Sequence, residues 1–375
     1  MADVPDPPPI PAALRPALRA LLRGERASWP DGATESDAVA LLESIELHGI
    51  APLVYARLSS TGESWPLHAA LRDSAIRAAA GEGLRLADLR TLLDAFADRG
   101  IRVLIIKGSA LAYDVYDAPE LRPRGDTDLL IAEEDYDAMR TIMRELGYGS
   151  QLTSGDTLAV RQQSFRRGGH VYDVHWDVTN SAVVRDALPF EELLYRAIAV
   201  PRISEYAFAP SHADALLLAC LHRVAHHHDN ERLIWLYDLH LLRERMSRDE
   251  HAAFWRRAAE RRVVAICERS IALADAWFED APHDRAADWL SDEERSRQEP
   301  SASFLHRSRT RAAHLGGDLK ALDWPSRLRR LRELALPPPA FMRQSFPSAP
   351  RVALPALYVW RGARGVVRLF RRVKD

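Results

Sequence analysis

Gly125-Asp126-Thr127-Asp128-Leu129-Leu130-Ile131, residues 125–131, is the stretch from which the fold can be read. Side chains at alternate positions of a strand point to one face, about 6.5–7 Å apart at Cα, so Asp126 and Asp128 share a face. The apolar residues that follow predict a strand that runs into the core. Two carboxylates on one face repel each other unless a cation lies between them, and their oxygens bind hard divalent cations. Taken alone, such a pair is more often a solvated pair of acids at a strand start.

The segment before this strand has the features of a phosphate-binding turn. Residues 101–106 form a short apolar run of strand type that ends at Lys107-Gly108-Ser109, and a short helix is predicted over 110–116. Glycine lets the backbone approach a ligand closely, and the free N–H groups at the start of a helix bind anions. The Ser109 hydroxyl adds a further donor. Many plain turns carry the same residues, so this turn alone is not specific.

A third acid lies on a later strand. Two strand-like runs, 159–165 and 170–178, are joined by the turn RRGG and predict a β-hairpin. On the second strand Asp173 and His175 share one face, because apolar side chains alternate with them. A half-exposed sheet edge would show the same alternation, so this segment gains meaning only beside the other two.

Helical patterns occupy most of the remaining chain, over 11–24, 36–59, 67–99 and much of the sequence after Ser211. We therefore predict an α+β fold in which a mixed sheet is embedded in a largely helical chain. The predicted division is an N-terminal helical region (1–100), an α/β core (101–208) and a C-terminal helical domain (209–375) with a polar linker near 279–303.

Composition limits the classes of partner. The 375 residues are 47% hydrophobic and carry a net charge of −2, so no global field attracts nucleic acid or an anionic membrane. The basic tail, residues 361–375, keeps RNA possible, but its apolar side favours an amphipathic packing helix. Two cysteines make a disulfide framework implausible and predict a reducing cytoplasm. No signal peptide and no membrane span are expected.

Histidines are concentrated in the segment HRVAHHHD, residues 222–229. His222 and His226 are four residues apart, so on a helix they share a face. That spacing is compatible with zinc, with Asp238 as a distant third ligand, although the glutamate of an H-E-x-x-H motif is missing. The other interpretations are a wall of an acceptor pocket and a structural or surface role.

The order of these pieces resembles the polymerase-β-like nucleotidyltransferases, in which a strand ending in Gly-Ser is followed by a D-x-D strand and a third acid. The closer resemblance is to the uncharacterised nucleotidyltransferase family called type 5, and it covers about residues 37–372. The stretches that carry it are GIRVLIIKGSAL, GDTDLLI, YDVHW, LLLACLHRVAHH and RLIWLYDLHLL. Thr127 departs mildly from the family pattern, which has isoleucine or valine between the two acids, and it leaves the acids intact.

The resemblance implies an enzyme of the nucleotidyltransferase class (EC 2.7.7), which moves a nucleoside monophosphate from an NTP, expected to be ATP, to a hydroxyl or similar acceptor and releases pyrophosphate. Asp126 and Asp128 would hold Mg²⁺ or Mn²⁺, and Asp173 would be a further metal ligand or the general base. The implied nucleotide-binding residues are Lys107, Gly108, Ser109, Arg122 and Arg124. The possible acceptor pocket comprises His175, His222 and His226.

Two other functions stay open from the sequence. One is a metal-dependent phosphohydrolase that uses the histidine-rich helix, and the other is a catalytically silent nucleotide-binding module. The presence of all three acids in order favours the transferase. The acceptor is not readable beyond a small metabolite, a peptide or a protein, with RNA less favoured, and the base of the NTP is not readable either.

Overall fold

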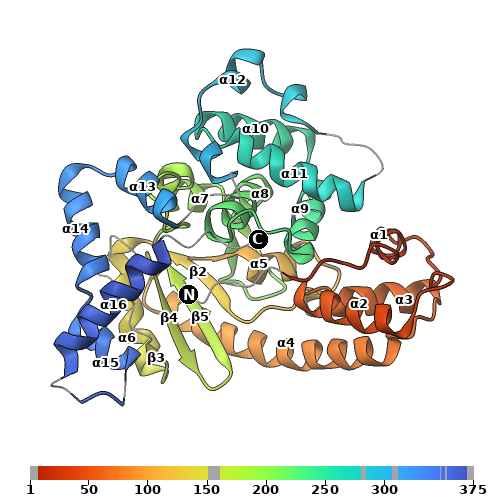
Figure 1. The fold of residues 1–375 in the computed structure, drawn as a ribbon, viewed down its shortest axis with the longest axis horizontal. Coiled ribbons are helices and arrows are strands. Elements are labelled where there is room, and N and C mark those ends of the chain that lie inside the picture. Colours follow the sequence, from red (N-terminus) through yellow and green to blue (C-terminus); the bar gives the residue numbers. More distant parts are fainter. Residues whose placement is uncertain are drawn as a thin grey trace.

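The predicted mixed sheet has five strands, in the order β1-β2-β5-β4-β3, and lies at the centre of the molecule (Figure 1). The computed structural model describes residues 7–150, 161–279, 284–305, 311–346, 348–350 and 353–369. The strands are β1 (Val103–Ile106), β2 (Thr127–Ile131), β3 (Gly149–Ser150), β4 (Gln162–Arg167) and β5 (His170–His175). The predicted hairpin is confirmed as β4 and β5, although residues 159 and 160 of its first strand lie outside the described residues.

One parallel pairing determines which residues of the sheet meet. β1 and β2 are antiparallel, but β2 and β5 are parallel, and their register sets Asp128 opposite Asp173. β4 then pairs antiparallel with β5 and places Ser164 opposite Asp173. Two acids 45 residues apart in sequence therefore lie on adjacent central strands.

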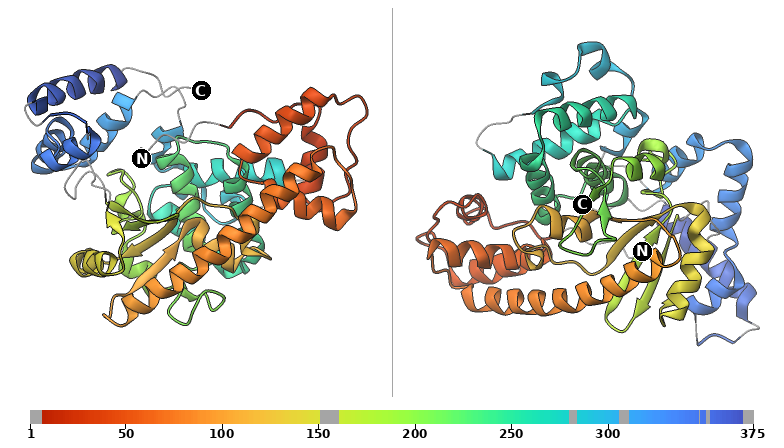
Figure 2. Two further views of the ribbon diagram at one scale, coloured as in Figure 1. Left: turned by 90° about the horizontal axis from the view of Figure 1, so that it is seen from below. Right: turned by 180° about the vertical axis from the view of Figure 1, so that it is seen from behind.

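The two faces of the sheet belong to two different hydrophobic clusters. Val103 and Ile105 of β1 pack with α4 (His68–Ala97) and α6 (Tyr136–Glu145). Leu104 of β1 and Leu130 of β2 pack on the opposite face, in a cluster with the N-terminal and C-terminal helices. Because Asp128 and Leu130 are two residues apart on β2, Asp128 faces the helical cluster. Figure 2 shows the long α4 running beneath the sheet.

The N-terminal helices follow the predicted patterns, with one break. The continuous helix expected over 36–59 divides at Gly49, which has φ 73°. Thr34 forms a capping box with Asp37 at the start of the first half. Gly100, expected to end the long helix, also has positive φ. The remaining N-terminal helices are α1 (Arg15–Leu22), α2 (Glu35–Leu47) and α3 (Ala51–Thr61).

Short elements connect the strands to one another and to the C-terminal helices. They are α5 (Lys107–Asp114), η1 (Pro119–Leu121), η2 (Glu133–Asp135), η3 (Arg185–Ala187), α7 (Phe190–Tyr195) and the ribbon β6 (Ile198–Ala199) with β7 (Phe208–Ala209). α5 and η1 lie between β1 and β2, η2 follows β2, and the others lie between β5 and the C-terminal helices. α5 begins at Lys107, three residues earlier than predicted, so Gly108 and Ser109 belong to the first helical turn.

The C-terminal helices cover the acid-bearing face of the sheet and extend beyond it (Figure 1). Ser211 caps the first of them by accepting the Asp214 N–H. The helices are α8 (His212–Leu221), the π-helical η4 (His222–His226), α9 (Leu233–Arg245), α10 (Arg248–Glu260) and α11 (Val264–Phe278). They are followed by η5 (Ala286–Asp288), α12 (Asp292–Ser296), η6 (Pro300–Leu305), α13 (Arg311–Ala321), α14 (Trp324–Ala335), α15 (Pro339–Ser345) and α16 (Leu354–Leu369).

The polar segment 279–303, predicted as a linker, contains short helices in its described part, where Ala286 and Leu290 are buried. The end of the basic tail, residues 370–375, lies outside the described residues. Within the described ranges, no single helix has the length and apolar character to cross a bilayer. The pair α2 and α3 meets these criteria only jointly, and the two helices are bent by 119°.

Candidate active site

A cavity of about 280 Å³ lies between the acid-bearing face of the sheet and the helices α5, α8, η4 and α9. All three predicted acids line it, together with Lys107, Gly108, Ser109, Arg122 and Arg124. His222 and His226 form part of the opposite wall. The structure thus brings together residues from four segments of the chain that the sequence singled out separately.

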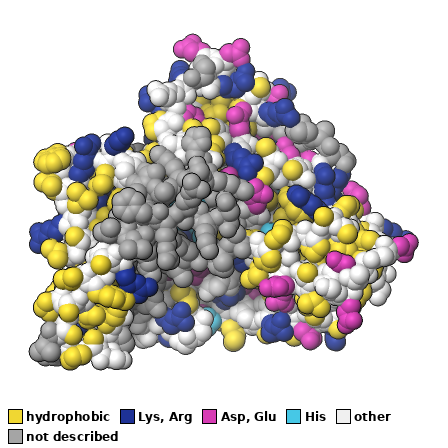
Figure 3. All heavy atoms as spheres, viewed as in Figure 1, with side chains coloured by type: hydrophobic (Ala, Val, Ile, Leu, Met, Phe, Trp, Pro, Cys, Tyr) yellow, Lys and Arg dark blue, Asp and Glu magenta, His cyan; other side chains and the backbone are white. Residues whose placement is uncertain are grey.

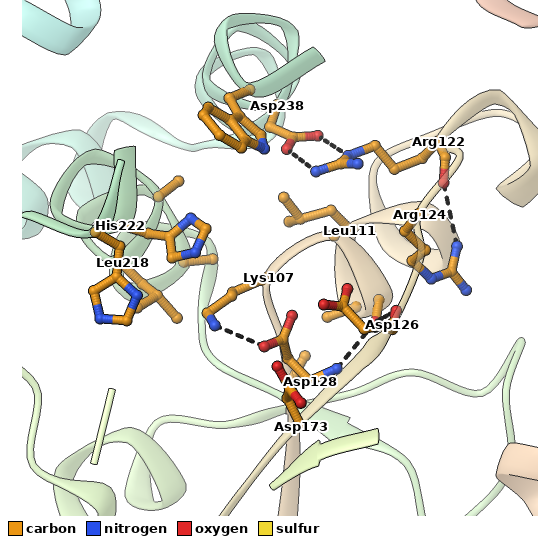
Figure 4. A pocket seen from close by; sticks show the side chains of 18 of the residues that line it. Lys107, Leu111, Arg122, Arg124, Asp126, Asp128, Asp173, Leu218, His222 and Asp238 are labelled. Atoms are coloured by element: carbon orange, nitrogen blue, oxygen red, sulfur yellow. Dashed lines mark hydrogen bonds and ion pairs between the residues drawn. The ribbon is translucent and has the colours of Figure 1, made fainter. Parts of the chain in front are cut away.

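The three acids converge because of strand position and register. Asp126 immediately precedes β2, Asp128 lies on β2, and Asp173 is the β5 partner of Asp128. Figure 4 shows their carboxylates turned toward the same space. Asp173 is held by Ser164, whose hydroxyl donates to its Oδ1 at 2.5 Å. Burial, together with the negative charges of Asp128 and Asp173, raises the pKa of Asp126 to about 6.

Lys107 supplies a positive charge directly to Asp128. Its Nζ lies 2.6 Å from Asp128 Oδ1, and His175 Nε2 lies 2.9 Å from the same oxygen. Burial alone would raise the pKa of Asp128, but the Lys107 charge and the His175 hydrogen bond hold it well below its ordinary value. Lys107 adopts φ 57°, a left-handed conformation that is uncommon for a residue with a side chain.

The first turn of α5 closes the cavity beside the acids. Gly108 leaves no room for a side chain, since a Cβ would lie 2.8 Å from Arg122 Nη2. The buried Ser109 hydroxyl accepts the Asp128 N–H at 3.4 Å and lies 3.5 Å from the carbonyl oxygen of Asp126. The N–H groups of this turn have no carbonyl partner within the helix, so they are available to an anion.

The predicted phosphate counter-charges Arg122 and Arg124 are already paired with carboxylates. Arg122 binds Asp238 of α9 through two hydrogen bonds of 2.8 Å, and Tyr116 donates to the same carboxylate at 2.8 Å. Arg124 binds Glu82 of α4 at 2.6 Å. Both ion pairs are buried, and they tie the loop before Asp126 to two long helices.

Arg232, at the N-cap of α9, is a lining residue that the sequence did not single out. Its Nε–H is buried and donates to no acceptor within the described part of the chain. The guanidinium carbon lies 5.5 Å from the centre of the Trp235 ring. Burial and the neighbouring Arg122 charge lower the pKa of Arg232. A lone arginine before a helix has no distinctive sequence signal, and only the folded cavity identifies it.

The histidine wall contains one more member than predicted. The spacing of an α-helix pairs His222 with His226, but this turn is π-helical, and a π-turn brings residue i+5 onto the same side. His227 therefore lines the cavity too, with its Nε2 3.3 Å from His222 Nε2 and its ring 4.3 Å from Trp235. Burial and the Lys107 charge lower the pKa of His222 and His226 well below the ordinary value, so these rings are neutral near pH 7.

His175 occupies a different place from the one predicted. It is 1% exposed and is bonded to Asp128 from behind, and it is not among the described residues that line the cavity. Burial, followed by the Lys107 charge, lowers its pKa. The alternation on β5 correctly placed His175 on the same face as Asp173. It did not show that His175, two residues further along the strand, is buried away from the cavity.

The donor set suits a magnesium ion held jointly with a nucleotide. Magnesium is commonly bound by one or two carboxylates together with waters and substrate phosphates. Asp126 and Asp128 meet that requirement, and the raised pKa of Asp126 reflects negative charge that lacks compensation. Among the described residues, no group of three or more His, Cys, Asp or Glu side chains is arranged to hold a metal by itself. Asp238, the distant third ligand in the zinc interpretation of His222 and His226, is bound by Arg122.

Comparison with known proteins agrees with this geometry. No curated protein matches the chain. One family model matches residues 34–279, a span that contains the sheet, the three acids and the histidine wall, and its description is uncharacterised nucleotidyltransferase. The match supports nucleotidyl transfer as the general activity and an NTP as substrate. Because the matched span exceeds half of the chain, this protein belongs to the family of uncharacterised nucleotidyltransferases.

Proposed function

We propose that this protein is a Mg²⁺- or Mn²⁺-dependent enzyme that transfers a nucleoside monophosphate from ATP to a hydroxyl or similar group and releases pyrophosphate. The observation that carries the proposal is the convergence of Asp126, Asp128 and Asp173 on one sheet face, beside the first turn of α5. Transfer at phosphorus depends mainly on positioning and on electrostatic stabilisation, and this cavity offers both.

Asp126 and Asp128 are the proposed metal ligands, and Asp173 is either a further ligand or the base that takes the acceptor's proton. A bound divalent cation would neutralise charge on the transferring phosphate and lower the pKa of the attacking hydroxyl. Ser164 of β4 fixes one oxygen of the Asp173 carboxylate through its 2.5 Å hydrogen bond. His175 orients Asp128 from the side away from the cavity.

The nucleotide phosphates are proposed to lie on the first turn of α5. The Gly108 and Ser109 N–H groups donate to them, and Gly108 permits the close approach that a side chain would block. Lys107 lies within reach of both Asp128 and this turn, so it counters charge on either. Arg122 and Arg124 add positive potential from their paired positions.

The acceptor is proposed to be a small metabolite, a peptide or a protein that enters along the histidine wall. His222 and His226 present neutral rings there, suited to hydrogen bonds with hydroxyl groups. Acidic and basic side chains are interspersed over the described part of the face in Figure 3, which favours these acceptors over RNA. We place the reaction in the cytoplasm because Cys220 and Cys267 are both free thiols.

The test uses α-labelled NTPs, each supplied with Mg²⁺ and an extract as the source of acceptor, with mass spectrometry for an added nucleoside monophosphate. The double variant Asp126→Asn and Asp128→Asn should lose transfer by about 100-fold or more, because two metal-binding charges are removed. Asp137→Asn, at an exposed site on α6, is the matched control.

Label transfer that survives the double substitution would refute the proposal. NTP hydrolysis that survives it, but depends on His222 and His226, would instead support the phosphohydrolase. Nucleotide binding without transfer or hydrolysis would identify a silent module.

A further inference from the structure

The positive charges of the cavity differ in what they already bind. Lys107 contacts Asp128, Arg122 binds Asp238, and Arg124 binds Glu82. Arg232 lines the same cavity, yet its guanidinium forms no hydrogen bond or ion pair within the described part of the chain. After these pairings, the uncommitted charges are the Asp126 and Asp173 carboxylates at one end and the Arg232 guanidinium at the other.

Apolar and backbone contacts hold Arg232 in place. The N-terminus of α9 is fixed by His48, whose Nδ1 accepts the Leu233 N–H at 3.1 Å and whose carbonyl accepts the Ile234 N–H at 3.2 Å. The Arg232 guanidinium then lies against the Trp235 ring. Gly49 leaves the necessary space, because a Cβ there would lie 3.4 Å from Arg232 Nη2.

A largely buried guanidinium without a polar partner is costly, and such groups ordinarily pair with an anion. The Arg232 charge acts on the same region as Arg122 and Asp126, since each of these charges influences the pKa of Arg232. Arg122 in turn lies directly over Gly108. Because Asp238 already neutralises Arg122, Arg232 supplies the uncompensated positive charge that an anion in this cavity would meet.

We propose that Arg232 binds the terminal phosphate of the NTP and thereby selects triphosphates over diphosphates and monophosphates. This inference rests on the proposed function, because it places the inner phosphates on the first turn of α5. The triphosphate then runs from the acids, past Gly108 and Arg122, to Arg232. Its metal-binding end meets the carboxylates, and its terminal negative charge meets the uncommitted cation.

The experiment measures binding to the full chain in excess Mg²⁺ by calorimetry, with α,β-methylene ATP, ADP and AMP as separate probes. Arg232→Gln should lower the affinity for the triphosphate analogue by about tenfold or more, lower the affinity for ADP less, and leave the affinity for AMP unchanged. Arg232→Lys should retain part of the triphosphate affinity. Arg99→Gln is the control, because Arg99 follows the C-terminus of α4 and is 54% exposed.

Inorganic tripolyphosphate serves as a probe that does not depend on the base. It should raise the thermal midpoint of the wild type and of Arg99→Gln, and raise that of Arg232→Gln much less. Thermal unfolding without ligand checks the fold, and Arg232→Gln should be no less stable than the wild type, because it removes a buried unpaired charge.

If Arg232→Gln lost affinity equally for the triphosphate analogue and for AMP, the assignment would be overturned. Unchanged affinity for both would overturn it too. In either case, triphosphate binding by the wild type would leave the proposed function standing. If the wild type binds neither the nucleotides nor tripolyphosphate, the proposed function fails and this inference fails with it. Selective loss of an acceptor's binding, with triphosphate affinity intact, would assign Arg232 to an acceptor anion instead.

Discussion

Lys107 contributes to the site through its position in the chain, its backbone conformation and its charge. It directly follows β1, begins α5 and carries a positive φ that only the surrounding structure can impose on a lysine. That conformation turns the side chain back to Asp128, where the ammonium lies 2.6 Å from Oδ1. The ammonium therefore occupies the position beside the acids at which a divalent cation would also be stabilised.

Replacing Lys107 by methionine tests this position. In metal-free buffer, Lys107→Met should lower the free energy of unfolding by about 3 kcal/mol, because a buried ion pair loses one partner. Mg²⁺ should then stabilise the variant more than it stabilises the wild type, since the cation replaces the missing ammonium. Urea unfolding with EDTA and with MgCl₂ measures both effects.

Lys320→Met, at an exposed position on α13, is the matched control and should behave as the wild type in both buffers. An equal or smaller response to Mg²⁺ in Lys107→Met than in the wild type would show that Lys107 does not substitute for a cation at Asp128.

At the scale of residues, the sequence predicted the acidic side chains of the site better than the basic ones. Asp126, Asp128 and Asp173 follow from alternation along strands, which is a local property. Arg232 does not, because its importance comes from having no partner inside a folded cavity. For Arg122, the sequence predicted a place near the acids. It did not predict the ion pair with Asp238, which is 116 residues away.

At the scale of elements, periodicity predicted helices and strands but not how they combine. The hairpin of β4 and β5 is local and was predicted, whereas the parallel pairing of β2 with β5 is nonlocal and has no signature in either strand. The family resemblance implied a mixed sheet but not which of its strands pair in parallel. The π-helical turn η4 was also not predicted. The residues HRVAH give no sign that this turn of the helix is wider than an α-helical one.

The helix α4 gives a prediction that concerns stability alone. Gly81 and Gly83 lie inside this 30-residue helix, and a Cβ at either position would meet no atom within 4 Å. Glycine inside a helix costs about 0.5–1 kcal/mol relative to alanine, mainly through chain entropy. The double variant Gly81→Ala and Gly83→Ala should therefore raise the free energy of unfolding by about 1–2 kcal/mol, measured in urea.

The buried Glu82 lies between these glycines and binds Arg124, so nucleotide affinity is the control measurement and should stay at the wild-type value. Unchanged or reduced stability would indicate that the glycines are needed for the conformation of α4 around Glu82. In that case, the single variants would identify which position is responsible.

At the scale of the molecule, the predicted three-part division remains a prediction, and the packing adds a constraint to it. One hydrophobic cluster includes Leu18 of α1, Leu53 of α3 and Trp255 of α10. Arg19 of α1 donates to the carbonyl of Trp277, near the end of α11. The helices before the sheet and those after it thus share a core.

His48 is a polar link in this shared core, and it makes stability depend on pH. Burial, followed by the charge of Arg232, lowers the pKa of His48 from 6.5 to about 4. Between these two values the unfolded chain binds a proton that the folded chain excludes, so stability falls as the pH drops from 6.5 toward 4. At about pH 5 this residue alone should reduce the free energy of unfolding by about 2 kcal/mol relative to pH 7.5.

The variant His48→Gln isolates this contribution, because it removes the titrating ring while its side-chain oxygen can still accept the Leu233 N–H. Urea unfolding at about pH 7.5 and about pH 5 should show a smaller loss of stability on acidification in the variant than in the wild type, by about 2 kcal/mol. Arg232→Gln should change the pH dependence in the same direction by a smaller amount, because it removes one of the two causes that lower the pKa of His48. Parallel pH profiles in the wild type and His48→Gln would show that His48 does not stay neutral in the folded core.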